Sequence, residues 1–171
     1  MKRIAMFLGP LAIAGVTLLV VGNGAVSAAK TRAGGVVHLY AADTAYDRNL
    51  DTEIYTGAIT DHGIDHQNAP GGNLVVLSKG SFKIDVTTLG NKLAAGPVDP
   101  KTCSFGTSAS APVPIVAGTG TGAYRGISGT IEVTASVAGI YPRLKRGKCN
   151  TNPNKFPGVL IAKGSGTVAY K

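Results

Sequence analysis

The segment Thr130-Ile-Glu-Val-Thr-Ala-Ser-Val137 alternates strictly between polar and apolar side chains. A period of two places successive side chains on opposite faces of a β-strand, whereas an amphipathic helix repeats every three to four residues. Ser81-Phe-Lys-Ile-Asp-Val86 shows the same alternation. We therefore predict two half-buried strands. Their inward faces would carry Phe82, Ile84 and Val86 in one strand and Ile131, Val133, Ala135 and Val137 in the other.

Further apolar runs bounded by Gly, Pro, Asn or Asp indicate more strands. They cover residues 36–41, 53–60, 74–77, 111–116 and 159–170. The polar stretches between them are predicted loops, at residues 43–52, 61–72, 89–107 and 141–157. Because 24 glycines and nine prolines disfavour helices, we predict an all-β fold of about seven or eight strands. A sandwich or a closed barrel of antiparallel hairpins fits this pattern.

Residues 1–28 have the pattern of a secretory signal peptide. Lys2 and Arg3 form a cationic start, residues 4–21 are largely apolar, and Val26-Ser-Ala28 offers small residues to a signal peptidase. The alternative is a retained membrane helix, which Gly9 and Pro10 would weaken. We expect cleavage and a single secreted, extracellular domain at residues 29–171, with no membrane attachment afterwards. The sequence does not predict its oligomeric state.

The positive charge is concentrated in the second half of the chain. The full chain has 17 Lys and Arg against nine Asp and Glu, and after residue 99 only Glu132 opposes nine basic residues. Such a surface attracts anionic polymers or lipids, or it simply keeps the protein soluble. We expect no specific nucleic-acid partner. The candidate contacts for an anionic polymer are Arg143, Lys145, Arg146 and Lys148.

Cys103 and Cys149 are the only cysteines. Because an exported chain meets an oxidising environment, we predict that they form one disulfide. Neither cysteine lies in a CxxC pair or beside a histidine, so a metal-binding or nucleophilic role is not favoured. We expect no cofactor.

Residues 118–129 read Gly-Thr-Gly-Thr-Gly-Ala-Tyr-Arg-Gly-Ile-Ser-Gly. A phosphate-binding loop would require a helix after the glycines, but here they lead into the predicted strand at residues 130–137. We therefore predict a bulged β-hairpin in which residues 113–116 pair with part of residues 127–137. The glycines would supply tight backbone geometry, which is a structural role. They are Gly118, Gly120, Gly122, Gly126 and Gly129.

This glycine segment resembles the Gly-Thr-Gly-x-Phe/Tyr-x-Gly-x-x-Gly signature of the dirigent and allene oxide cyclase family. The resemblance extends over most of residues 35–171 and is nearest to secreted bacterial members. It implies an eight-stranded antiparallel barrel of calycin type, and a cyclase or isomerase acting inside that barrel is one activity it implies. The signature itself shapes the barrel and does no chemistry, so we assign no catalytic residue.

Thr60-Asp-His-Gly-Ile-Asp-His66 contains two Asp-His pairs, and His38 lies on a predicted strand with Val36 and Tyr40. Gly63 disfavours the helix that would bring His62 and His66 onto one metal ion, so we predict no metal site. Solvated loop residues and groups at a barrel rim are the other interpretations, and His38 could be a core residue. The candidate ligand-binding groups near the barrel mouth are Tyr40, Tyr55, Asp61 and His62.

Three functional classes follow. We rank first a secreted barrel that binds a small apolar ligand or an extracellular partner without chemistry, because the predicted interior is small and apolar and the sequence shows no catalytic constellation. The second is the cyclase or isomerase that the resemblance implies. The third is cationic adhesion to an anionic surface polymer, which salt would weaken. For the barrel rim, period two predicts that Asp61 and His62 point to opposite faces and cannot act together.

Overall fold

The computed structural model describes residues 33–43, 51–67, 69–94, 96–152 and 158–171. The predicted signal peptide lies outside these residues. The described strands all belong to one compact unit, Thr31–Lys171. Within the described ranges, no helix is both long enough and apolar enough to cross a membrane.

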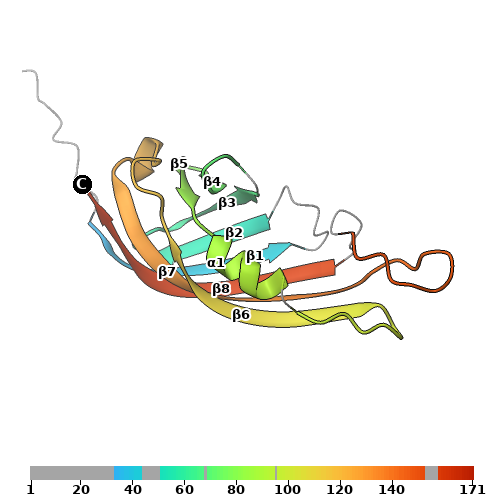
Figure 1. Cartoon of the computed structure of the whole chain (residues 1–171). Helices are drawn as coiled ribbons and strands as arrows, with labels where there is room; N and C mark the ends of the chain where they lie inside the picture. Colours follow the sequence, from blue (N-terminus) through green and yellow to red (C-terminus); the bar gives the residue numbers. More distant parts are fainter. Residues whose placement is uncertain (1–32, 44–50, 68, 95, 153–157) are drawn as a thin grey trace, which may run out of the picture. The chain divides into compact units, whose positions relative to one another are not determined.

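Eight antiparallel strands of the described chain form one curled sheet (Figure 1). In chain order they are β1 (Gly35–Asp43), β2 (Asp51–Gly57), β3 (Asp61–His66), β4 (Asn73–Leu77), β5 (Gly80–Ile84), β6 (Ser104–Pro114), β7 (Ile127–Ile140) and β8 (Gly158–Tyr170). Across the sheet the order is β5-β4-β3-β2-β1-β8-β7-β6. The predicted all-β class and antiparallel pairing are confirmed. Buried side chains on the two strands first recognised, including Phe82, Ile84, Ile131 and Val133, confirm their predicted inward faces.

Two of the predicted loops contain regular structure. Residues 61–72 include β3, whose inward side chains at Asp61 and Asp65 are polar, so the strand lacks the apolar alternation that marks a half-buried strand. Residues 89–107 include most of the helix α1 (Thr87–Ala94) and the first residues of β6. Both loop predictions are wrong for these residues.

The two outer strands of the sheet meet at one end. Ile84 of β5 bridges Ile115, just beyond β6, and the backbone N–H of Asp85 donates to Pro114 O at 2.9 Å. The N–H of Val116 donates to Lys83 O at 2.9 Å. Where the strands diverge from this contact, α1 lies against β6 on the concave side of the long, curved strands (Figure 1). The interior is thus bounded by the concave face of the sheet and by α1.

The glycine segment forms the predicted hairpin and also covers the edge of β5. Val113 pairs with Ile131, and Gly122–Tyr124 make a single 3₁₀ turn, η1, with no α-helix after it. The N–H of Thr121 donates to Ser81 O at 2.8 Å, and the Ser81 N–H donates to Thr121 Oγ1 at 3.0 Å. Because these bonds occupy polar backbone groups on an outer strand, they protect an edge that could otherwise pair with another chain.

Two glycines show why this cover requires residues without a side chain. A Cβ on Gly120 would lie 1.9 Å from Tyr124 O. Gly122 has φ +55°, and a Cβ there would lie 2.4 Å from Lys79 O. Gly118, Gly126 and Gly129 also have positive φ. The glycines therefore let the segment approach the β4–β5 turn and bend back.

Candidate functional site

A cavity of about 570 Å³ lies on the concave side of the sheet. Its apolar wall comes from the sheet, with Leu39, Val133 and Val137, and from α1, with Leu89 and Leu93. The interior beside η1 is filled instead by aromatic rings. Phe82 lies between Tyr55 and Tyr124, with ring centroids 5.9 and 5.4 Å away.

Small side chains in one row of the sheet leave the space that forms the cavity. In the strand register, Ala41 is opposite Ala162, Ala162 is opposite Ala135, and Ala135 is opposite Ala109. All four are buried or partly buried on the inner face. A small barrel normally fills with its own side chains. Here the methyl groups are too short to do so.

The row of alanines ends on an acidic group. Ala41 is opposite Glu53 of β2, and Glu53 is 3% exposed. On the next strand, Asp65 lies diagonally from Glu53 on the same face and is 4% exposed. Glu53 and Asp65 line the cavity, together with the amides of Gln67 and Asn73. The cavity therefore has its carboxyl and amide groups at this end, while the rest of its lining is mainly apolar, with Tyr141 and Thr151 as the exceptions.

Hydrogen bonds fix both carboxyl groups. Tyr55 Oη donates to Glu53 Oε2 at 2.8 Å, and Asn73 Nδ2 donates to Asp65 Oδ2 at 2.8 Å. Asp65 Oδ1 is buried and accepts no hydrogen bond from the described residues. An unsatisfied buried acceptor costs about 1–3 kcal/mol, so this end of the cavity carries a polar atom whose hydrogen-bonding capacity is unused by the described residues.

Burial changes the acidity of the groups at this end. It raises the pKa of Asp65 to about 6, against the opposing effect of the Asn73 hydrogen bond. Burial, followed by the nearby Glu53 carboxyl, raises the pKa of Tyr55 well above its usual value. Tyr55 therefore stays a neutral donor to Glu53, while Asp65 exchanges its proton close to neutral pH.

Asp61 belongs to a different cluster, whose hydrogen bonds hold parts of the fold together. It accepts hydrogen bonds from the hydroxyl of Ser78, from Tyr124 Oη at 2.5 Å, and from the N–H groups of His62 and Lys79 at 2.9 and 3.1 Å. Burial would raise the pKa of Asp61, but these four donors outweigh it and hold the pKa well below its usual range. The carboxylate joins β3 to the β4–β5 turn and to η1.

Of the four predicted ligand-binding residues, the structure brings together only Tyr55 and Asp61, which are opposite each other on β2 and β3. Tyr40 and His62 are exposed on the outer face, because the residues beside them, Leu39 and Asp61, face inward. Tyr55 and Asp61 are buried, and none of the four lines the cavity. Placing Tyr40 and His62 at the mouth was therefore wrong, whereas the expectation that Asp61 and His62 face opposite ways is confirmed.

His38 also faces outward, so its interpretation as a core residue is wrong. The residues that do form the polar end, Glu53 and Asp65, were missed. The available signal was the order of residues in the predicted strand at residues 53–60: Glu53 and Tyr55 share a face by period two. Recognising that this face is the inner one requires the pairing with Leu39 and Ala41 of β1.

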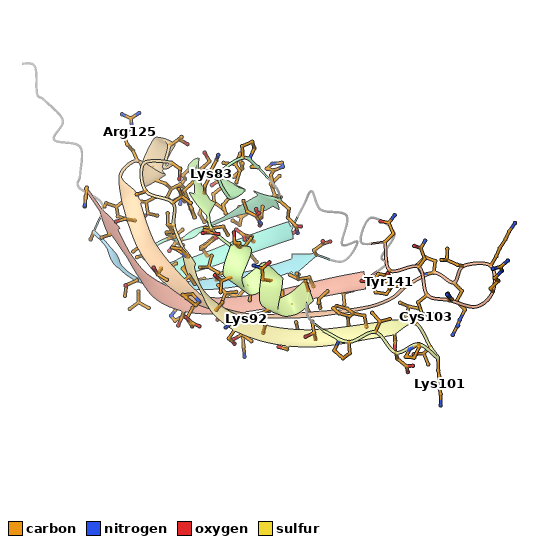
Figure 2. All side chains as sticks on the ribbon, in the orientation of Figure 1. Lys83, Lys92, Lys101, Cys103, Arg125 and Tyr141 are labelled. Carbon is orange, nitrogen blue, oxygen red and sulfur yellow. A yellow bond between two sulfur atoms is a disulfide. The ribbon has the colours of Figure 1, made fainter. Side chains whose placement is uncertain are left out.

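The predicted disulfide is confirmed. Cys103 is bonded to Cys149, with their Cα atoms 5.4 Å apart. The disulfide anchors a hairpin, residues 141–150. In this hairpin the backbones of Arg143 and Cys149 form an isolated antiparallel β-bridge, and the Leu144 N–H donates to Lys148 O at 2.8 Å. Figure 2 shows nitrogen-tipped side chains at the end of this hairpin, beyond Cys103 and Tyr141.

Among the described residues, no three His, Cys, Asp or Glu side chains form a group that could hold a metal ion. Comparison of the chain with models of known families, with curated proteins and with solved structures gave no match. The resemblance to the dirigent and allene oxide cyclase family, and the cyclase or isomerase activity that it implies, therefore stay predictions.

Proposed function

We propose that this protein binds a small, largely apolar ligand in the cavity between the curled sheet and α1. The observation that carries this proposal is the alanine row, which leaves a space of about 570 Å³ where a small barrel would ordinarily be filled. Ligand pockets in proteins commonly measure roughly 300–1,000 Å³, with apolar walls and a few placed polar groups. The Cys103–Cys149 disulfide supports an extracellular setting, because disulfides persist in oxidising compartments.

Filling the cavity is the direct test. With N-phenyl-1-naphthylamine as a fluorescent apolar probe, Ala135→Phe is expected to weaken binding by about tenfold or more, because the ring would occupy the space that the probe needs. The matched control is Ala138→Phe on the same strand, whose side chain is exposed on the outer face. Equal affinity of both variants and the wild type would refute the proposed site.

The hairpin at residues 141–150 supports a second candidate function, adhesion to an anionic polymer. Arg143 is used internally, since its guanidinium donates to Gly147 O and Lys101 O. The side chains of Lys145, Arg146 and Lys148 are exposed and carry no hydrogen bond or ion pair to the described residues. A disulfide-anchored tip with three available cations can approach an extended polyanion without moving the sheet.

Salt dependence tests this second candidate. On immobilised heparin as the polyanion probe, Lys145→Gln with Lys148→Gln is expected to reduce the slope of log affinity against log salt by about two, roughly one per lost contact. Lys163→Gln with Lys171→Gln removes the same charge from exposed positions elsewhere and is the control. Equal slopes for the two double variants would eliminate the hairpin as the contact.

A further inference from the structure

We infer that the ligand of this cavity is an organic cation: an apolar body that lies along the alanine row and carries an ammonium or similar group at the Glu53–Asp65 end. This inference rests on the proposed ligand-binding function and adds the chemical class of the ligand. Three observations support it: the negative charge of the carboxyl groups at the polar end, the unsatisfied Oδ1 of Asp65, and the row of alanines that leads to these groups.

The polar end offers acceptors. Of its four polar side chains, Glu53 and Asp65 are carboxyl groups, and the Asn73 amide N–H already donates to Asp65 Oδ2. No Lys, Arg or His lines the cavity among the described residues. Two carboxyl groups on neighbouring strands, with no cation beside them in the described lining, give this end a negative potential. An anionic head would be repelled here.

Asp65 indicates where the head of the ligand lies. Its side chain is 4% exposed and contributes to the cavity lining, Oδ2 is held by Asn73, and Oδ1 is buried without a partner among the described residues. The oxygen is therefore oriented by the protein but not satisfied by it. A neutral hydroxyl would satisfy Oδ1, but a cation would in addition offset the cost of keeping two desolvated carboxyl groups together.

The apolar lining next to the polar end indicates that the rest of the ligand is apolar. From Glu53, the register runs to Ala41, Ala162 and Ala135 with side chains no larger than a methyl group. Leu89 and Leu93 of α1 face this path from the other side of the cavity. A body without polar groups loses no hydrogen bonds to water on entering such a space, whereas a polar one would.

The proposal is tested with three ligands that share one chain and differ in the head group: decylamine, decan-1-ol and decanoate. Each is used to displace N-phenyl-1-naphthylamine at neutral pH. Decylamine, as its ammonium ion, is expected to displace the probe at a concentration about tenfold or more below that of decan-1-ol, because a charge-assisted hydrogen bond is roughly twice as strong as a neutral one. Decanoate is expected to be the weakest.

Two variants assign the preference to the carboxyl groups. Asp65→Asn and Glu53→Gln keep the shape of the site and are each expected to remove most of the advantage of decylamine while leaving probe binding within about twofold of wild type, since the apolar path is untouched. Glu132→Gln, which removes an exposed carboxylate elsewhere, is the control and should keep the advantage.

The pH profile gives an independent readout. Glu53 and Tyr55 on β2 and Asn73 on β4 face Asp65. As Asp65 loses its proton, the affinity for decylamine is expected to rise between about pH 5 and about pH 7, and Asp65→Asn should abolish that rise. Equal displacement by all three head groups, or the tightest binding by decanoate, would overturn the cation while leaving the ligand-binding function standing. Absence of probe binding would overturn both.

Discussion

Replacement of Asp61 by alanine is expected to lower the free energy of unfolding by about 4 kcal/mol, since one buried donor and three partly buried donors lose their acceptor at once and a buried loss costs about 1–3 kcal/mol. The donors are the hydroxyls of Ser78 and Tyr124 and the backbone N–H groups of His62 and Lys79. Tyr124 is fully buried, so water cannot replace the carboxylate there. Urea unfolding of the variant measures the loss.

Asp85→Ala is the control for removal of a carboxylate that accepts a backbone hydrogen bond at the surface. Asp85 is exposed and accepts from the Thr87 N–H at 2.9 Å. Its loss is expected to cost no more than about 1 kcal/mol. Tyr124→Phe should recover part of the Asp61 effect, and a double-mutant cycle between the two positions should give a coupling of about 1 kcal/mol or more. Equal losses in the two aspartate variants would contradict the structural role of Asp61.

The stability of the fold at low pH is also expected to depend on the Asp61 carboxylate. Because the pKa of Asp61 is lower in the folded chain than in the unfolded chain, its contribution to stability is complete above the unfolded value of about 4 and is lost as pH falls through the folded value. Asp65 has the opposite sign. Its raised folded pKa of about 6 means that stability falls as pH rises from about 4 to about 6, because the unfolded chain then releases its proton first. Asp65→Asn should remove that decline.

Alternation of side chains was sufficient to predict those strands whose buried face is apolar. It predicted β5 and β7 with the correct inward residues, because Phe82, Ile84, Ile131 and Val133 face the core. It failed at β3, where the inward positions hold Asp61, Gly63 and Asp65. Hydrophobic patterning detects burial through apolar side chains, so a strand that turns carboxyl groups inward has the sequence of a loop.

The candidate site could not be predicted for the same reason. Period two assigns Glu53 and Tyr55 to one face of β2 but does not say which face is inside. That depends on the pairing with β1, which puts Glu53 opposite Ala41. The alanine row likewise combines residues from distant parts of the chain, and only the register of β8 with β1 and β7 makes it continuous. These are long-range relations that single-chain patterning does not contain.

For the glycine segment, the local structure was predicted correctly, but its contact with the edge of β5 was not. A hairpin with tight backbone geometry at its glycines was predicted and is present, with positive φ angles that include those at Gly118 and Gly129. Thr119 and Thr121 between the glycines gave no signal of their own. In the structure, Thr119 Oγ1 accepts from the Lys83 N–H and Thr121 Oγ1 from the Ser81 N–H, which makes the segment a cover for the β5 edge. Their role depends on strands about forty residues earlier.

Loss of the disulfide is the second change expected to have a large effect. The double variant Cys103→Ala with Cys149→Ala should unfold in urea with a free energy about 4 kcal/mol below that of the wild type, as the chain-entropy treatment gives for a closed loop of this length. The loop spans 46 residues and contains all of β6 and β7, the pair that carries Ala135 and part of the apolar cavity wall.

A reducing agent distinguishes the contribution of the disulfide bond to stability from the other effects of the two substitutions. Under reducing conditions the wild type should fall to the stability of the double variant, and the variant should not change, because it has no thiol left. Cys103 is fully buried, so alanine also removes packing at that position, and a residual difference of about 1 kcal/mol between the reduced wild type and the variant would measure that part. A wild type whose urea midpoint does not move on complete reduction would show that the packing of β6 on β7 alone fixes the loop.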